Sequence, residues 1–294
     1  MAITAGDVAK LRSQTGAGMM DCKKALEEAG GDMEKAGDIL RKKGIVKAAK
    51  RADKIAAEGA TLVKVSGHVA VVLEMNSETD FVAKNESFKK LAEDIADHIL
   101  LSKPAGMEEL LGQSLAGGQS VEEYINNISG TIGEKISLRR FVAIEKSAND
   151  AFGAYVHMGG KISVLVLLTG TVNEELAKEV AMHVAASNPR YIRREEVSGA
   201  VVDKEKEIYG DQLRQQGKPD NIIENILKGK VDKFYGEVCL LEQSFIKDEE
   251  KKVEQYIQSQ AAGAKVEKMV RFELGEGIEK KSCDFAAEVT GQMR

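Results

Sequence analysis

The chain has 294 residues, of which 43% are hydrophobic and 30% charged, and its formal net charge is −5. This length allows one large domain or several small ones, and the composition excludes both a disordered chain and an integral membrane protein. The acidic balance, with 5% aromatic residues and no tryptophan, also argues against a nucleic-acid-binding protein, which needs basic surfaces and stacking aromatic rings.

The cysteines indicate the compartment. Cys22, Cys239 and Cys283 are far apart and form no C-x-x-C pair, so we expect neither a disulfide framework nor a zinc site. The N-terminus has no basic segment followed by an apolar one, as a secretory signal would. A cytoplasmic location is therefore predicted. Cys22 lies in helical phase with Ala25 and Leu26 and is predicted to be a small core residue.

The first 45 residues predict three short helices, a pattern typical of a small docking module. Thr4 and Asp7 form a capping box for the first helix, which breaks at residues 15–18. The second helix is expected over residues 19–29, and Asp32 caps a third that ends at Gly44.

Residues 41–54 carry seven basic side chains against one acidic residue, Asp53. Two interpretations remain open. The charges can simply solvate a helix and a tether, which is the usual role of such runs, or they can form a basic linker that faces an acidic partner.

From residue 59 the pattern changes to mixed strands and helices. Strands are expected over residues 60–66, 68–74, 137–146, 151–157, 162–169 and 264–274, and helices over 87–101, 121–132, 173–187 and 248–260. Between them, two helices over 193–216 and 220–235 are expected to form a hairpin through a narrow apolar seam. The seam residues are Ile223, Leu227, Val231 and Phe234, with Val197, Val201 and Ile208 opposite. A last amphipathic helix presents Phe285 and Val289.

An internal repeat links two parts of this region. Residues 67–74 match 160–167 at an offset of 93, and residues 91–99 match 176–184 at an offset of 85. The first copy therefore carries eight more residues between strand and helix, within residues 76–86, and such an insertion is a candidate functional segment. His98 and His183 fall at equivalent helix positions, which favours a structural role over a catalytic one.

Catalytic signatures are missing from the sequence. It contains no phosphate-binding glycine loop, no nucleophile elbow and no H-x-x-H pair for a metal. We therefore expect a protein that is not an enzyme and that binds no cofactor and no nucleotide directly.

Two segments stand out instead. Residues 15–26 place Met19 and Met20 at the start of a helix beside a glycine turn, where they either pack in a core or form an adaptable docking surface. Residues 74–84 place Phe81 beside Asp80 within the inserted segment. Phe81 either folds back into the core or is presented to a partner.

Both segments resemble signature motifs of the bacterial elongation factor Ts family. The first is LRSQTGAGMMDCKKAL, residues 11–26, and the second is EMNSETDFVAK, residues 74–84. The similarity continues through residues 155–160, 181–187, 271–280 and 284–289. Members of this family are guanine-nucleotide exchange factors for the GTPase elongation factor Tu.

The resemblance implies an α+β fold. Its parts are an N-terminal ubiquitin-associated-like three-helix module, a duplicated core with antiparallel sheets, a protruding coiled-coil hairpin and a small C-terminal module. In this numbering they are the helical module and linker (1–55), core subdomain N (56–146), core subdomain C (147–188 and 237–275), the hairpin (189–236) and the C-terminal module (276–294).

The resemblance also implies which residues contact elongation factor Tu. They are Leu11, Arg12, Met19, Met20, Thr79, Asp80, Phe81, Val82, His157, Asp284 and Phe285. The first four and the last two would dock on the GTPase domain, the His157 loop would contact another domain, and residues 79–82 would displace the partner's Mg²⁺. Asp80 could act by repelling phosphate or by attracting a partner residue, and residues 102–120 are assigned no role. The competing interpretation is a ubiquitin-associated-like interaction scaffold without exchange activity.

Overall fold

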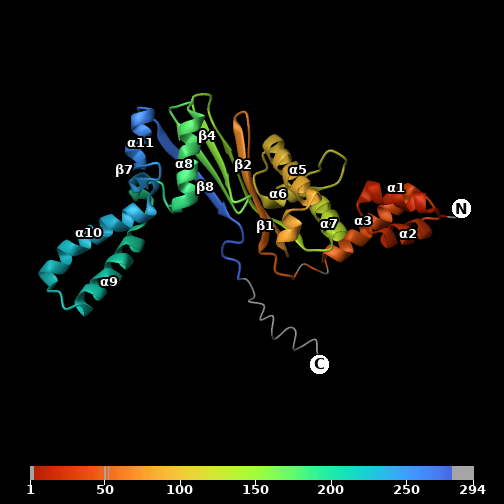
Figure 1. Ribbon diagram of the computed structural model, residues 1–294, viewed down its shortest axis with the longest axis horizontal. Coiled ribbons are helices and arrows are strands. Elements are labelled where there is room, and N and C mark those ends of the chain that lie inside the picture. Colours follow the sequence, from red (N-terminus) through yellow and green to blue (C-terminus); the bar gives the residue numbers. More distant parts are fainter. Residues whose placement is uncertain (1–2, 50, 52, 280–294) are drawn as a thin grey trace. The chain divides into compact units, whose positions relative to one another are not determined.

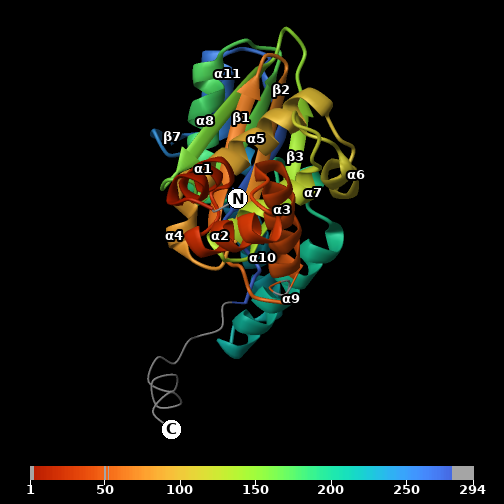
Figure 2. The same ribbon diagram turned by 90° about the vertical axis from the view of Figure 1, so that its right-hand side faces the viewer.

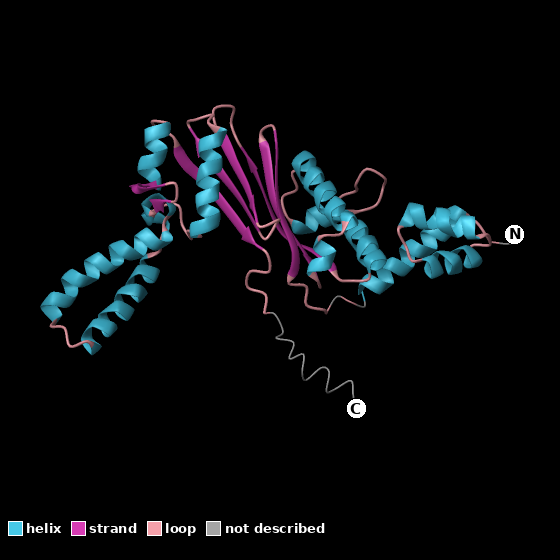
Figure 3. Ribbon diagram, viewed as in Figure 1, coloured by secondary structure: helices cyan, strands magenta, loops and turns pink. Residues whose placement is uncertain are grey.

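The computed structural model describes residues 3–49, 51 and 53–279 (Figure 1). The described residues divide into two compact units. The first comprises residues up to 62, residues 73–141 and those from 273 onward, and the second comprises 63–72 and 142–272. Helices and antiparallel strands are mixed along the chain (Figure 3), as the α+β prediction requires. No helix of the described part is long and apolar enough to cross a membrane.

The first unit begins with the predicted helical module, made of α1 (Ala5–Thr15), α2 (Met19–Glu28) and α3 (Met33–Ala49). These helices pack on one another (Figure 2). The capping box is confirmed, because Asp7 N donates to Thr4 Oγ1 over 3.2 Å and Thr4 N donates to Asp7 Oδ2 over 3.0 Å. Cys22 is fully buried, as predicted. It belongs to a core of six small and medium side chains: Val8, Leu11, Cys22, Ala25, Leu26 and Ala36.

The prediction that Gly44 ends the third helix is wrong, since α3 continues to Ala49. Gly44 is instead the place where α3 crosses α7 (Val121–Ile132). A Cβ atom on Gly130 of α7 would lie 2.6 Å from the Cα of Gly44. Arg41 reinforces the crossing, with its Nη2 3.0 Å from Glu123 Oε1. Gly44 therefore serves close helix packing rather than helix termination.

The first sheet has the order β1 (Glu58–Ser66), β2 (Val69–Ser77), β3 (Ile136–Glu145). Every residue of the central strand β2 is buried. The chain then forms α4 (Asp80–Ala83), α5 (Glu86–Ser102), α6 (Met107–Gly112) and α7 before it returns as β3. The amphipathic helix α5 buries one face, which includes Phe88, Leu91, Ile95 and Ile99.

The second unit contains a sheet of order β4 (Ala151–His157), β5 (Ile162–Thr169), β8 (Lys265–Glu273). Strands β4 and β5 are antiparallel, with Ala151 opposite Leu168 and His157 opposite Ile162. Helix α8 (Glu174–Ser187) packs on these two strands. Gly153 permits the close approach, because a Cβ there would lie 2.0 Å from the carbonyl oxygen of Ala177.

The prediction of one helix over residues 248–260 is wrong for residues 248–252. Asp248–Lys252 is a strand, β7, paired with β6 (Ser244–Phe245), and α11 covers only Val253–Gln260. The five residues of β7 are all charged and carry no helical apolar pattern. Their conformation is set by pairing with a strand that precedes them.

The helical hairpin is formed by α9 (Gly199–Gln215) and α10 (Asp220–Val238), which pack against each other. The first helix starts later than predicted, because residues 194–196 form a short 3₁₀ turn in which the Glu196 carboxylate accepts the backbone N–H of Ile192. Ile223 and Phe234 are buried as predicted. Ile208 is 41% exposed, so its assignment to the seam is wrong. Val202 and Leu213 are the buried apolar residues of α9.

Both helix histidines bond to a glutamine. His98 Nε2 lies 2.8 Å from Gln113 Oε1, and the fully buried His183 Nε2 lies 2.9 Å from Gln243 Oε1. This agrees with the predicted structural role of the two residues. The predicted last helix, with Asp284, Phe285 and Val289, lies outside the described residues.

Candidate functional site

The segment between β2 and α5 presents one aromatic side chain to solvent. Helix α4 is a single turn that begins after Thr79, and within it Val82 is buried whereas Phe81 is 77% exposed. The alternative in which Phe81 folds back into the core is therefore wrong. Lys84 lies beside it, with Nζ 2.8 Å from Asp80 Oδ2 and 5.6 Å from the centre of the Phe81 ring. The segment thus offers an apolar tip flanked by one acid and one base.

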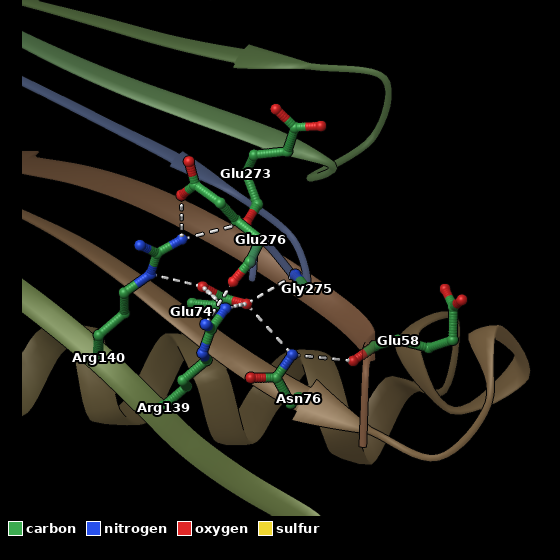
Figure 4. Close-up of polar contacts among 8 residues, drawn as sticks. All are labelled: Glu58, Glu74, Asn76, Arg139, Arg140, Glu273, Gly275 and Glu276. Carbon is green, nitrogen blue, oxygen red and sulfur yellow. Dashed lines mark hydrogen bonds and ion pairs between the residues drawn. The ribbon is translucent and has the colours of Figure 1, made fainter. Parts of the chain in front are cut away.

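A buried ionic cluster lies on strand β2, a few residues before this segment (Figure 4). Glu74 is fully buried, with Arg139 Nη1 3.0 Å from its Oε1 and Arg140 Nε 2.6 Å from its Oε2. The backbone N–H of Gly275 and the side-chain amide of Asn76 also donate to Oε1, over 2.8 and 3.2 Å. Burial acts to raise the pKa of Glu74, but these donors outweigh it and the pKa is lowered. Glu74 is therefore held ionised.

This cluster fixes the chain that follows β8. Arg140 Nη2 donates to the carbonyl oxygen of Glu273 over 3.1 Å and lies 3.0 Å from Glu276 Oε2. Arg139 donates to the carbonyl oxygen of Glu276. Residues 273–276 are thereby attached to Glu74, Arg139 and Arg140, which belong to the same unit. The segment after Glu276 starts from this anchored point.

The predicted contact residues of the helical module differ in exposure. Met19 is 44% exposed and Met20 64%, and Arg12 is also at the surface. Leu11 is only 1% exposed, because it belongs to the core of the module. Its side chain is therefore buried in this structure, and its contact with elongation factor Tu stays a prediction.

The predicted His157 loop is the turn between β4 and β5. His157 is half-buried, with its Nδ1 3.1 Å from the hydroxyl of Tyr155. On either side, Val156 is 45% exposed and Met158 65%. Met158 has a left-handed backbone with φ 49°, which is unusual for a residue other than glycine. The turn therefore presents two apolar side chains beside the imidazole.

Comparison with known protein families gives a match to the model described as Elongation factor TS, over residues 78–276. The match covers more than half of the chain. The chain belongs to the elongation factor Ts family. It accordingly has a role in translation elongation. The match begins at Glu78, directly before the segment that presents Phe81, and ends at Glu276, in the cluster around Glu74.

Sequence reasoning did not identify the ionic cluster of this elongation factor Ts family member. One signal was available, because Glu74 is the only charged residue of a fully buried strand. A charge at such a position needs partners. Neither their identity nor their place in the chain, at residues 139, 140 and 275, follows from the strand alone.

Proposed function

We propose that this chain is a guanine-nucleotide exchange factor that binds elongation factor Tu and promotes release of GDP. The observation that carries the proposal is Phe81, a large aromatic side chain that is 77% exposed on a one-turn helix between two well-packed elements. Exposed aromatic residues on a rigid support are typical binding hot spots. The family membership supports the same partner and a cytoplasmic location.

The mechanism is a coupling between two binding events. A GTPase holds GDP through backbone amides of its phosphate loop and through a Mg²⁺ ion. Insertion of Phe81 and Asp80 beside that ion displaces the elements that hold it and weakens nucleotide binding. By linkage, nucleotide weakens binding of this chain by the same factor. No covalent bond is made or broken, so the protein is not an enzyme and needs no cofactor.

Other surfaces extend the contact in this proposal. Arg12, Met19 and Met20 of the helical module dock on the GTPase domain, while Leu11 keeps the module folded beneath them. The turn with His157 contacts a further domain of the partner, and its exposed neighbour Met158 adds apolar area. Asp284 and Phe285 keep their predicted role in a further GTPase-domain contact.

We also propose that the core is duplicated and that α9 and α10 form a short coiled coil. Each copy would be a three-stranded sheet with one long helix, α5 or α8, and the paired contacts of His98 with Gln113 and of His183 with Gln243 support this. The connection between strand and helix is residues 78–85 in the first copy and 170–173 in the second, so it is four residues longer in the first copy and not eight, as the repeat predicts. The proposal of a duplicated core uses the same domain boundaries as those expected from the sequence.

The test is release of fluorescent GDP from elongation factor Tu, followed by stopped flow with excess unlabelled GDP. We expect the full chain to accelerate release in proportion to its concentration until the complex saturates. Tight binding to elongation factor Tu without any acceleration would contradict the proposal and would favour the interaction scaffold.

A further inference from the structure

Thr79, the residue before α4, is held by a carboxylate from a distant part of the sequence. Its backbone N–H donates to Glu134 Oε2 over 2.9 Å, and its hydroxyl donates to Glu134 Oε1 over 2.8 Å. Thr79 occupies the N-cap position of α4, where a threonine hydroxyl ordinarily accepts from the helix backbone. Here the hydroxyl is used to bind Glu134 instead.

The contact is reciprocal. Glu78, the residue before Thr79, accepts the backbone N–H of Lys135, the residue after Glu134, at Oε1 over 2.7 Å. Its other oxygen, Oε2, lies 2.6 Å from Nζ of Lys54. Burial acts to raise the pKa of Glu78, but the Lys54 and Lys135 donors outweigh it, so the pKa is lowered. The Glu134 carboxylate thus binds the backbone of the residue after Glu78, and the Glu78 carboxylate binds the backbone of the residue after Glu134. We call residues 78, 79, 134 and 135 the carboxylate clamp.

The clamp lies directly before the turn that carries Phe81. A single helical turn is unstable by itself, because helix nucleation costs more than one turn returns. The turn α4 must therefore be oriented from its two ends. Val82 is buried at its C-terminal side, and the clamp fixes its N-terminal side.

We infer that Glu134 is a positioning residue for nucleotide exchange, which acts through Thr79 to hold Phe81 in its presented orientation. The inference rests on the proposed exchange function. Without the Glu134 carboxylate, the N–H and the hydroxyl of Thr79 lose their acceptor, and the N-terminal end of α4 retains the contacts of Glu78 and of Ser77, whose hydroxyl donates to the carbonyl oxygen of Thr79. The less ordered turn must then be ordered during the exchange step, which raises the free-energy barrier of that step. Ordering even one backbone residue is equivalent to about a tenfold change in population. We expect Glu134→Ala to slow maximal GDP release about tenfold.

The first experiment is stopped-flow GDP release with Glu134→Ala, Glu134→Gln and Thr79→Ser. Glutamine keeps one acceptor oxygen, and serine keeps both donors of Thr79. We therefore expect these two variants to retain most of the activity that alanine loses. The matched control is Glu109→Ala, because Glu109 also accepts a backbone N–H, that of Ala105 over 2.9 Å, in the same unit but away from α4. That control should release GDP at the wild-type rate.

A double-mutant cycle separates positioning from general destabilisation. If Glu134 acts through Phe81, Glu134→Ala should cause no further slowing in a Phe81→Ala background. Equal slowing in both backgrounds would overturn the inference, as would a wild-type rate for folded Glu134→Ala.

The second measurement needs no partner. Amide hydrogen exchange of the free chain should become about tenfold faster at Thr79, Lys84 and Asn85, whose N–H groups donate hydrogen bonds at the two ends of α4, in Glu134→Ala and remain unchanged in Glu109→Ala. Unchanged protection at those amides would overturn the positioning role. If the wild-type chain failed to accelerate GDP release, the proposed function would fall, and this hydrogen-exchange comparison would still decide whether Glu134 positions the segment.

Discussion

Phe81 and Phe88 lie seven residues apart on consecutive helices, and their environments are opposite. Phe81 on α4 is 77% exposed, whereas Phe88 on α5 is 1% exposed in the core of the first unit. The two residues are a matched pair for separating binding from stability, because truncation to alanine removes the same atoms from both.

Phe81→Ala should leave the free energy of unfolding within about 0.5 kcal/mol of the wild type, as is usual for surface substitutions. Loss of a hot-spot contact of roughly 2–3 kcal/mol should slow GDP release by about 30- to 150-fold. Phe88→Ala should instead cost about 3–5 kcal/mol of stability and leave the release rate per folded molecule unchanged. Urea denaturation and stopped flow on both variants check this. A large stability loss in Phe81→Ala would show that the ring is structural.

Gly130→Ala should separate α3 from α7, because the added Cβ would lie 2.6 Å from the Cα of Gly44. Overpacking of this kind costs about 1–3 kcal/mol. The control is Gly37→Ala, which lies on α3 as Gly44 does, since its added Cβ would meet no atom within 4 Å. That substitution should stabilise the helix by about 0.5–1 kcal/mol. Thermal melting of the two variants should therefore shift in opposite directions, and equal shifts would contradict the close crossing.

Glu74→Ala should be strongly destabilising, by about 3 kcal/mol, because it leaves Arg139 and Arg140 without their buried counter-charge. Glu74→Gln should cost less, since an amide oxygen can still accept the N–H of Gly275. The control is Glu86→Ala, whose side chain is 88% exposed in its ion pair with Lys89 and should change stability by no more than about 0.5 kcal/mol. Chemical denaturation of the three variants measures the free energy of unfolding that each one loses. A neutral Glu74→Ala would show that the cluster contributes no net stability.

Stability should fall in two stages as the pH is lowered. Burial lowers the pKa of His183 below its ordinary 6.5 despite the bond to Gln243. The unfolded chain therefore binds the proton first, and this contribution is complete above pH 6.5 and declines below it. The hydrogen bond from Arg194, followed by that from Lys252, lowers the pKa of Glu242 from 4.5 to about 2 despite its burial. Its contribution is present above pH 4.5 and is lost as the pH falls towards 2.

Denaturation midpoints measured from pH 8 to pH 3 check these two stages. His183→Gln should remove the upper stage and retain the lower one, because glutamine does not titrate. If the stability of that variant still declined near pH 6, the upper stage would belong to a titratable group other than His183.

Deletion of residues 1–52 should leave the remainder folded while it weakens capture of elongation factor Tu. The helical module has its own small core, but the deletion also uncovers the face of α7 that contacts α3. We therefore expect cooperative melting at a lower temperature than that of the full chain. Calorimetry and binding to the nucleotide-free partner are the measurements, and loss of cooperative melting would show that the module is part of the core.

Several elements follow from the sequence alone because their signals are local. The capping box of Thr4 and Asp7 sets the start of α1, and the strands Ala151–His157 and Ile162–Thr169 have the bounds that their apolar patterns predict. In each case the cause lies within a few residues of the effect, so the chain order itself contains it.

Other features were decided only by tertiary structure. Asp248–Lys252 is a strand because β6 pairs with it, and α3 passes Gly44 because α7 crosses there. Glu74 is satisfied by side chains 65 and 66 residues away and by a backbone N–H 201 residues away. Glu134 reaches Thr79 across 55 residues. Pairing, burial and ionic contact depend on which distant segments meet, and no local pattern specifies that meeting.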